Sequence, residues 1–144
     1  MNYNYFILPF FLLMAQMSVA QNLSGNELLE KSIQYHDPSD NWSTWKPEFT
    51  LKFDAKNRPA RISTVEFNNK NNRFHLTVDQ EGRTVERIIK KGGCINLLDG
   101  KTTTDTALIK KYRLNCDRTT MYRNYYTYLY GLPMKLKDGG TIIH

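Results

Sequence analysis

The middle of the chain is dominated by runs in which apolar and polar side chains alternate, and this alternation constrains the fold more than any other feature. The alternating runs cover residues 49–54, 62–67, 74–78 and 85–90, and a short apolar run follows at 94–98. Strict alternation is typical of β-strands that bury one face. Short polar or glycine-containing segments separate the runs, and strands joined in this way pair antiparallel. The sequence therefore predicts an antiparallel sheet of about five strands.

Segments with helical periodicity flank the predicted sheet. Ser24 and Glu27 form a capping box ahead of an amphipathic stretch, which predicts a helix over residues 25–35. A second helix is predicted over residues 105–112, and its apolar residues are three or four positions apart. Helices with one apolar face can pack on a sheet, so the fold class is predicted to be α+β, with helices packed on the antiparallel sheet.

The first twenty residues have the pattern of a secretory signal peptide. An uncharged apolar run is followed by Ser18 and Ala20, small residues at positions −3 and −1 of a cut after Ala20. An uncleaved membrane anchor is the alternative, but the run is shorter than a membrane-spanning helix and contains Pro9. We therefore expect a signal peptide over 1–20 and a single α+β domain over 21–144, exported to the periplasm or the cell exterior.

Positive charge is concentrated in the last third of the chain. The net charge is +6, and residues 101–144 hold eight Lys and Arg against three Asp and Glu. A basic patch of this kind attracts phosphates, anionic headgroups or membrane surfaces. Ordinary solvated surface is the equally simple alternative.

The two cysteines, Cys94 and Cys116, are predicted to form a disulfide, because an exported protein folds in an oxidising compartment. A bridge across this spacing is worth about 3 kcal/mol in the chain-entropy model. Two free buried thiols and a metal site are the alternatives. No metal-binding or cofactor-binding motif occurs in the sequence, so neither a metal nor a cofactor is predicted.

His36 and Asp37 are the most catalytic-looking pair, because a histidine beside a carboxylate can act as a general base. Adjacent residues on a turn seldom face one another, and Asp37 with Pro38 is already expected to end the first helix. His75 alternates out of the apolar face of its strand and is expected on the solvent side. No catalytic motif is present, and no catalytic residue is assigned.

A tyrosine-rich segment follows the second cysteine. As a helix capped by Asp117 or Thr119 and ended near Gly131, it places five residues on one stripe: Met121, Tyr122, Tyr125, Tyr126 and Leu129. As a strand, it would instead place Tyr126, Tyr128 and Tyr130 on one face. The cap and the exit through Gly131 and Pro133 favour the helix.

Aromatic and apolar residues of this segment are the candidate ligand-binding residues, together with one tryptophan. They are Tyr122, Tyr125, Tyr126, Leu129, Tyr128, Tyr130 and Trp45. Trp42 and Trp45 precede the first strand and form either a ligand platform or, as we favour, a buried plug. Interleaved Arg and Tyr also resemble a platform for single-stranded nucleic acid. An exported protein rarely meets that ligand, so nucleic acid is not an expected partner.

Four segments carry a resemblance to a known family: ELLEKSIQYHDPSDNW (27–42), GGC (92–94), KKYRLNCDR (110–118) and MYRNYYTYLYGLPMKLKD (121–138). With the signal peptide, they resemble an uncharacterised family of exported bacterial proteins, a domain of unknown function. That family is similar to the lipoprotein-carrier (lipoprotein localisation factor) superfamily. The resemblance implies a curved antiparallel sheet, a half-open barrel with helices packed on one face, whose concavity holds acyl chains.

These observations favour a non-enzymatic exported protein that binds an apolar or lipid-like ligand in a half-barrel cavity, with a possible anionic headgroup. A periplasmic hydrolase-like enzyme using His36 and a carboxylate is one alternative. A protein-interaction module with an unknown partner is another. Thr141–Ile143 has the character of a starting strand, and members of the resembled family are longer. The chain is therefore expected to be truncated at its C-terminus, inside an unfinished sheet.

Overall fold

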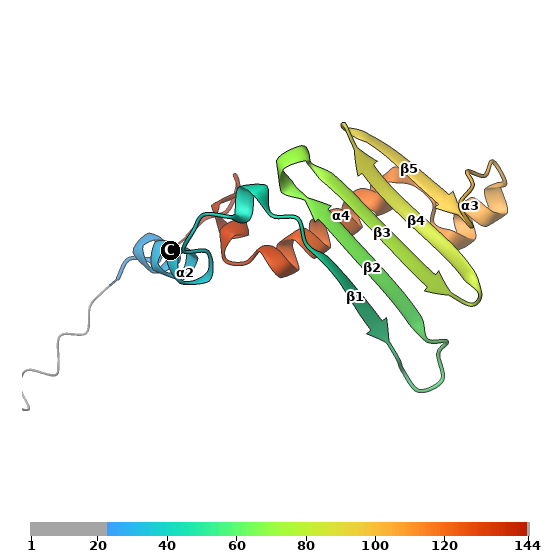
Figure 1. The fold of residues 1–144 in the computed structure, drawn as a ribbon, viewed down its shortest axis with the longest axis horizontal. Helices are drawn as coiled ribbons and strands as arrows, with labels where there is room; N and C mark the ends of the chain where they lie inside the picture. Colours follow the sequence, from blue (N-terminus) through green and yellow to red (C-terminus); the bar gives the residue numbers. More distant parts are fainter. Residues whose placement is uncertain (1–22, 144) are drawn as a thin grey trace, which may run out of the picture.

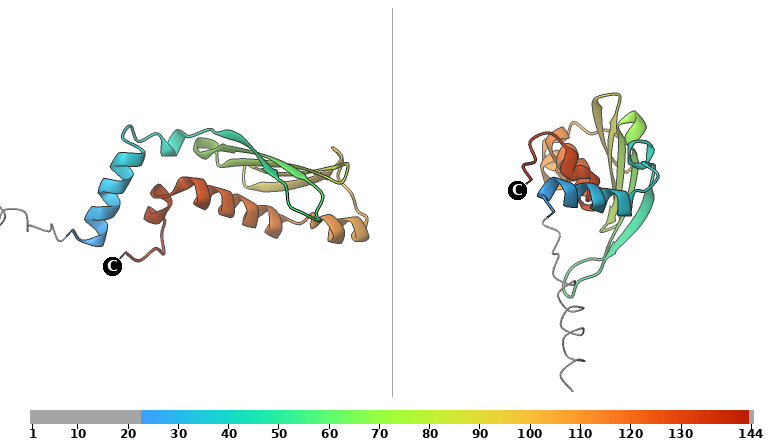
Figure 2. Two further views of the ribbon diagram at one scale, coloured as in Figure 1. Left: turned by 90° about the horizontal axis from the view of Figure 1, so that it is seen from below. Right: turned by 90° about the vertical axis from the view of Figure 1, so that its left-hand side faces the viewer.

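A computed structural model describes residues 23–143, which form two layers (Figures 1 and 2). One layer is a five-stranded antiparallel sheet in the order β1-β2-β3-β4-β5. Its strands are β1 (Glu48–Phe53), β2 (Arg61–Asn68), β3 (Arg73–Gln80), β4 (Arg83–Lys90) and β5 (Gly93–Leu98). The other layer is a long helix, α4 (Cys116–Gly131), which crosses one face of the sheet. The predicted α+β fold with an open antiparallel sheet is confirmed.

The strands form where the alternation predicts them, because each buries one row of side chains against α4. One such row runs across the whole sheet: Val65 pairs with Phe49 and Leu76, Leu76 pairs with Arg87, and Arg87 pairs with Asn96. The turn between β3 and β4 is the pair Glu81-Gly82, and both residues have positive φ (54° and 71°). This is the backbone that a two-residue hairpin turn requires.

The hydrophobic core lies between the sheet and α4. It consists of Val65, Phe67, Phe74, Leu76, Ile89 and Tyr126. Phe74 and Leu76 in the central strand are fully buried, and each such side chain contributes roughly 1.5–3 kcal/mol through burial. Trp45 stacks on Phe67, with ring centroids 6.4 Å apart, so this partly buried tryptophan packs against the core.

The first described helix, α2 (Gly25–His36), begins as predicted with the capping box of Ser24 and Glu27. It extends away from the end of the sheet instead of covering it (Figure 2). None of its residues is buried, and Leu28 is exposed. The expectation that its apolar face packs on the sheet is therefore wrong. An ion pair between Glu30 and Lys137 connects α2 to the 3-10 turn η5 (Met134–Lys137).

Two helices follow the sheet, and α4 confirms the helical interpretation of the tyrosine-rich segment. The shorter helix, α3 (Thr106–Tyr112), is capped by Asp105, whose side chain accepts hydrogen bonds from two backbone N–H groups. The cap of α4 is Asn115, whose side chain accepts from the backbone N–H of Arg118 at 2.8 Å. The predicted caps, Asp117 and Thr119, lie inside the helix. Asn115 accepts the capping bond with its amide oxygen, two residues before Asp117 and four before Thr119.

Gly131 has a different role from the one its position suggests. It is the last helical residue of α4 and is buried, and Leu132 follows it as the C-cap. A β-carbon at Gly131 would lie 2.5 Å from the ring of Trp42. The glycine is therefore needed for the close approach of Trp42, not for a left-handed helix exit.

The described C-terminal residues do not continue the sheet. Residues 141–143 form no strand, contrary to the expectation from their sequence. The predicted signal peptide at 1–20 lies outside the described residues. Within residues 23–143, no helix has the length and apolar character needed to cross a membrane.

Candidate ligand-binding cavities

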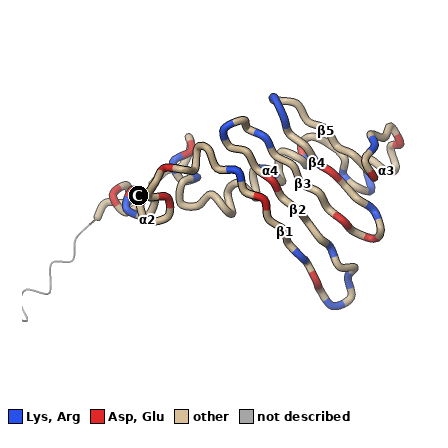
Figure 3. The backbone as a smooth tube through the Cα atoms, viewed as in Figure 1, with Lys and Arg blue, Asp and Glu red and all other residues tan. Residues whose placement is uncertain are grey.

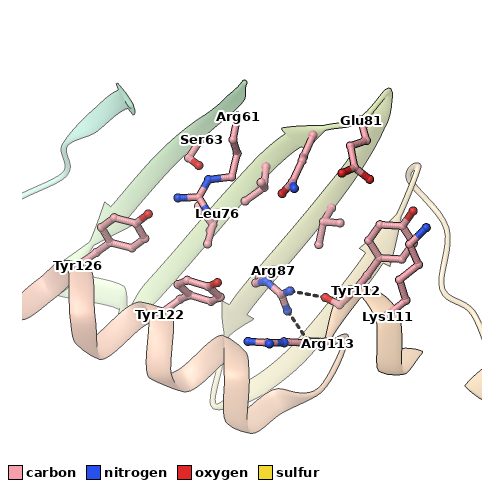
Figure 4. A pocket seen from close by; sticks show the side chains of 13 residues that line it. Arg61, Ser63, Leu76, Glu81, Arg87, Lys111, Tyr112, Arg113, Tyr122 and Tyr126 are labelled. Atoms are coloured by element: carbon pink, nitrogen blue, oxygen red, sulfur yellow. Dashed lines mark hydrogen bonds between the residues drawn. The ribbon is translucent and has the colours of Figure 1, made fainter. Parts of the chain in front are cut away.

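A cavity of about 370 Å³, here called the inner cavity, lies between the sheet and the helices α3 and α4 (Figure 4). Its volume is at the lower end of the range for small-molecule sites. It is lined by Arg61, Ser63, Leu76, Val78, Gln80, Glu81, Val85, Arg87, Lys111, Tyr112, Arg113, Tyr122 and Tyr126. The strands thus contribute three apolar side chains, Leu76, Val78 and Val85, among polar and charged ones, and the helical side contributes tyrosines and basic residues.

Strand pairing explains which side chains reach the inner cavity. Ser63 pairs with Val78, and Val78 pairs with Val85, so these three residues face α4 side by side. Arg61 lies two positions before Ser63 on the same strand and has the same orientation. The sheet therefore presents a small apolar floor with a guanidinium at one side (Figure 4).

A second cavity of about 400 Å³, here called the edge cavity, lies between β1 and α4. It is lined by Leu51, Lys52, Phe53, Arg61, Ser63, Met121, Tyr122, Tyr125, Tyr126 and Leu129. Four residues line both cavities: Arg61, Ser63, Tyr122 and Tyr126. The two cavities are therefore neighbouring parts of one space beneath the sheet.

The buried side of α4 differs from the predicted stripe. Thr119 and Tyr126 are buried and Tyr122 is half-buried, at spacings of three and four residues. The other predicted stripe residues are exposed: Met121 by 41%, Tyr125 by 56% and Leu129 by 50%. The stripe is thus only partly right, because α4 is rotated so that these three residues line the edge cavity instead of the core.

Polar and covalent bonds at the first turn of α4 explain this rotation. Cys116 forms the predicted disulfide with Cys94 of β5, which excludes the alternatives of free thiols and a metal site at these cysteines. Thr119 is fully buried, and its hydroxyl donates to Oδ1 of Asn96 at 2.6 Å. Both contacts bind the same side of α4 to β5, and they leave Met121 and Tyr125 on the outer flank.

Three other candidate residues lie away from the inner cavity. Tyr128 is exposed and lines none of the cavities described here. Tyr130 contacts Phe49, with ring centroids 4.3 Å apart. Tyr130 and Trp45 line a third cavity of about 620 Å³ at the α2 end of the molecule, here called the α2 cavity.

The α2 cavity also contains His36 and Asp37 in its lining, so the structure brings the candidate catalytic pair close to Tyr130. Asp37 is already engaged, because its two carboxylate oxygens accept from the backbone N–H groups of Asn41 and Trp42, each at 2.8 Å. Among the described residues, no hydrogen bond joins His36 to Asp37. The carboxylate therefore stabilises the turn after α2 instead of orienting the imidazole.

Arg87 is the most deeply buried basic group of the inner cavity. Its side chain is 5% exposed, and its terminal nitrogens donate to the carbonyl oxygens of Tyr112 at 2.7 Å and Arg113 at 2.8 Å. The guanidinium also lies over the ring of Tyr122, 5.3 Å from its centroid. Burial lowers the pKa of Arg87, and the positive charges of Arg118 and Arg113 act in the same direction. Arg87 thus binds the C-terminal end of α3 to β4.

The opposite face of the sheet carries a separate polar cluster. His75 lies between Glu66 and Glu86, with each ring nitrogen 3.1 Å from a carboxylate oxygen. This places His75 on the outer face, as predicted from its position in the strand. Throughout residues 23–143, no group of three or more metal-binding side chains is arranged to hold a metal ion.

Sequence reasoning missed the two strand arginines of the inner cavity. Both follow the alternation that defines the sheet: Arg61 has the orientation of Val65, and Arg87 lies between Val85 and Ile89. A charged residue in an inward position of a half-buried strand is unusual. An arginine at an inward position of the alternation was therefore the sequence feature that could have identified both residues. Figure 3 shows further Lys and Arg around α3, where Lys111 and Arg113 line the same cavity.

Comparison with known proteins gives a family but no function. No curated protein and no solved structure shows significant similarity to the chain. The sequence profile of a group described as "Family of unknown function (DUF6503)" matches residues 4–144. The chain therefore belongs to this family of unknown function.

Proposed function

We propose that the chain is an exported, non-enzymatic protein that binds an apolar or lipid-like ligand in the space beneath the sheet. The observation that carries the proposal is the pair of adjoining cavities, about 370 and 400 Å³, on the helix-covered face. Their shared wall and apolar floor offer a concave, mostly hydrophobic surface, which is the usual form of a small-molecule site. The exposed row of Met121, Tyr125 and Leu129 adds apolar surface at the edge cavity.

The mode of binding that we propose is like that of the lipoprotein carriers, in which a half-open barrel encloses acyl chains. An open antiparallel sheet with a helix along one face supports this mode. Export of the chain is part of the proposal. The disulfide between Cys94 and Cys116 supports it, because such bonds persist mainly in oxidising compartments.

Blocking the shared wall of the two cavities tests this proposal. Ser63 is buried and lines both cavities, so Ser63→Phe should fill space that the ligand needs. Excluding about two methylene groups costs roughly 1.6 kcal/mol, and we expect the affinity for a fluorescent fatty-acid analogue to fall by about tenfold or more. Fluorescence titration measures this affinity, and mass spectrometry identifies what co-purifies after loading with lipid extract.

The neighbouring variant Thr64→Phe is the matched control. Thr64 is on the same strand but faces the opposite side of the sheet, so its replacement should leave binding unchanged. Wild-type protein that stays empty after loading, and that releases no dye when fatty acids are added, would show that the cavities do not bind such ligands.

A hydrolase-like activity at the α2 cavity is a second candidate, favoured by the shared placement of His36, Asp37 and Tyr130. If His36 acts as a general base there, His36→Ala should lower kcat/KM for a p-nitrophenyl ester by roughly 100-fold. The control is His75→Ala, because His75 lies on the outer face of the sheet. Hydrolysis no faster than in buffer, or equal rates for His36→Ala and the wild type, would exclude this activity.

A further inference from the structure

The guanidinium of Arg61 has an unusual position at the start of β2. Its side chain points from the sheet into the space above α4, close to Tyr122 and Tyr126 (Figure 4). Its Nε atom is buried and has no hydrogen-bond partner among the described residues. A buried donor of a charged group without a partner is costly, and native structures rarely leave one unexplained.

The surroundings of Arg61 contain a surplus of positive charge. The inner cavity is lined by four basic side chains, Arg61, Arg87, Lys111 and Arg113, and by one carboxylate, Glu81. Within residues 23–143, none of the four forms an ion pair. Positive charge held this close together in a partly enclosed space favours the binding of an anion.

The two strand arginines, Arg61 and Arg87, differ in whether the protein supplies acceptors for their N–H groups. Arg87 has carbonyl oxygens as partners for both terminal nitrogens. Arg61 lies over the ring of Phe53, 5.4 Å from its centroid, and has no comparable acceptor. The nearby hydroxyl of Tyr126 does not neutralise it, because burial raises the pKa of Tyr126 and keeps this group uncharged. Of the two strand arginines, Arg61 is therefore the one that is free to bind an anion.

Arg61 also lies where the inner cavity and the edge cavity adjoin, since it lines both. An anion bound there would have apolar surface on either side: Leu76 and Val78 in one cavity, Leu51 and Leu129 in the other. The geometry thus combines one charged contact with an extended apolar lining.

We propose that this space binds amphipathic anions, whose single carboxylate or phosphate head is held by Arg61 and whose apolar body lies in the adjoining cavities. The inference rests on the proposed function, because it specifies the ligand of the same cavities. An arginine presents Nε–H and a terminal N–H as a fork that matches two oxygens of a carboxylate or phosphate. An anion in the cavity would therefore give this guanidinium the acceptor that it lacks.

The test compares three ligands that share a ten-carbon chain: decanoate, decyl phosphate and decan-1-ol. Isothermal titration calorimetry measures the affinity of the wild-type chain for each. We expect at least one anion to bind about tenfold more tightly than the alcohol, the low end of what a hydrogen bond to a charged group contributes. A preference for decanoate or for decyl phosphate identifies the head group.

Two substitutions at Arg61 separate charge from geometry. Arg61→Met should reduce the preference for the anion to about twofold or less and leave the affinity for decan-1-ol unchanged. Arg61→Lys keeps the charge without the fork, so it should retain only part of the preference. Arg73→Met is the matched control, because Arg73 is exposed and has the opposite orientation to Phe74 on β3. It should keep the full preference.

The outcomes distinguish this inference from the proposed function. If none of the three ligands binds, the proposed function fails and the inference fails with it. If the alcohol and the anions bind equally to the wild type, or if Arg61→Met retains the preference, apolar binding stands and the role of Arg61 is overturned. The comparison of ligands on the wild type needs no variant, so it decides the question even if Arg61→Met does not fold.

Discussion

Replacing Arg87 with methionine is expected to lower the free energy of unfolding by about 2–4 kcal/mol, because it leaves two acceptors in a buried site without donors. Arg87 donates to the carbonyl oxygens of Tyr112 and Arg113, which end α3, and it contacts the ring of Tyr122. Methionine has a similar length but no donor. The loss should be visible in urea denaturation, as a lower midpoint with an unchanged slope.

Two further variants, Arg87→Lys and Arg73→Met, serve as comparisons for the stability of Arg87→Met. Lysine keeps the charge but cannot present two parallel donors, so Arg87→Lys should lose less stability than Arg87→Met. Arg73→Met makes the same chemical change at an exposed position of β3 and should scarcely alter stability. An Arg87→Met variant as stable as the wild type would contradict this prediction. It would mean that the cost of desolvating the guanidinium is as large as the stabilisation from its hydrogen bonds.

The double substitution Cys94→Ser and Cys116→Ser is expected to lower stability by about 3 kcal/mol, because it frees a loop closed across 22 residues of separation. For a domain of this size, the melting temperature should fall by roughly 10 °C. Thermal denaturation followed by circular dichroism, without reductant, measures this change.

The same experiment with reductant provides the control for the disulfide. Reduced wild-type protein should melt close to the double variant, whereas the double variant should not respond to the reductant. Hydrogen exchange should show the largest loss of protection in the first turns of α4, where Thr119 would be left as the main polar contact to β5. Mass analysis of oxidised protein that shows two free thiols would contradict the bond itself.

The sheet was predictable from sequence because its first four strands alternate and its fifth is a short apolar run between glycines. Alternation identified the inward rows, and the short polar or glycine-containing segments between the runs marked the turns. Such local patterns fix strand direction and face without knowledge of distant contacts. The same alternation also places Arg61 and Arg87 on the helix-covered face, so these two site residues could have been found.

The orientation of the helices was less predictable. Tyrosines occur on several sides of α4, so its composition does not select one buried face. The face is chosen by contacts from outside the helix: the disulfide at Cys116 and the bond from Thr119 to Asn96. For α2, the apolar residues indicated a packed face, yet the turn held by Asp37 directs the helix away from the sheet.

The cavities could not be predicted at all, because their volumes depend on how side chains from separate elements leave space unfilled. Gly131 illustrates the limit. Its position at the end of a helix indicated a left-handed exit, but the structure uses its missing side chain to admit the ring of Trp42. Whether this glycine is needed for the backbone conformation or for a neighbouring side chain is decided by Trp42, which lies 89 positions earlier in the sequence.

The two ends of α4 are bound to the sheet by different kinds of contact, so they differ in how far they can move. Near β5, a covalent bond and directional hydrogen bonds fix the helix in one position. Near β1, it is held through aromatic contacts, such as that of Tyr130 with Phe49, which have broad energy minima. We expect the β5 end of α4 to stay fixed while its β1 end moves slightly, so that ligands of different width can be accommodated on the β1 side.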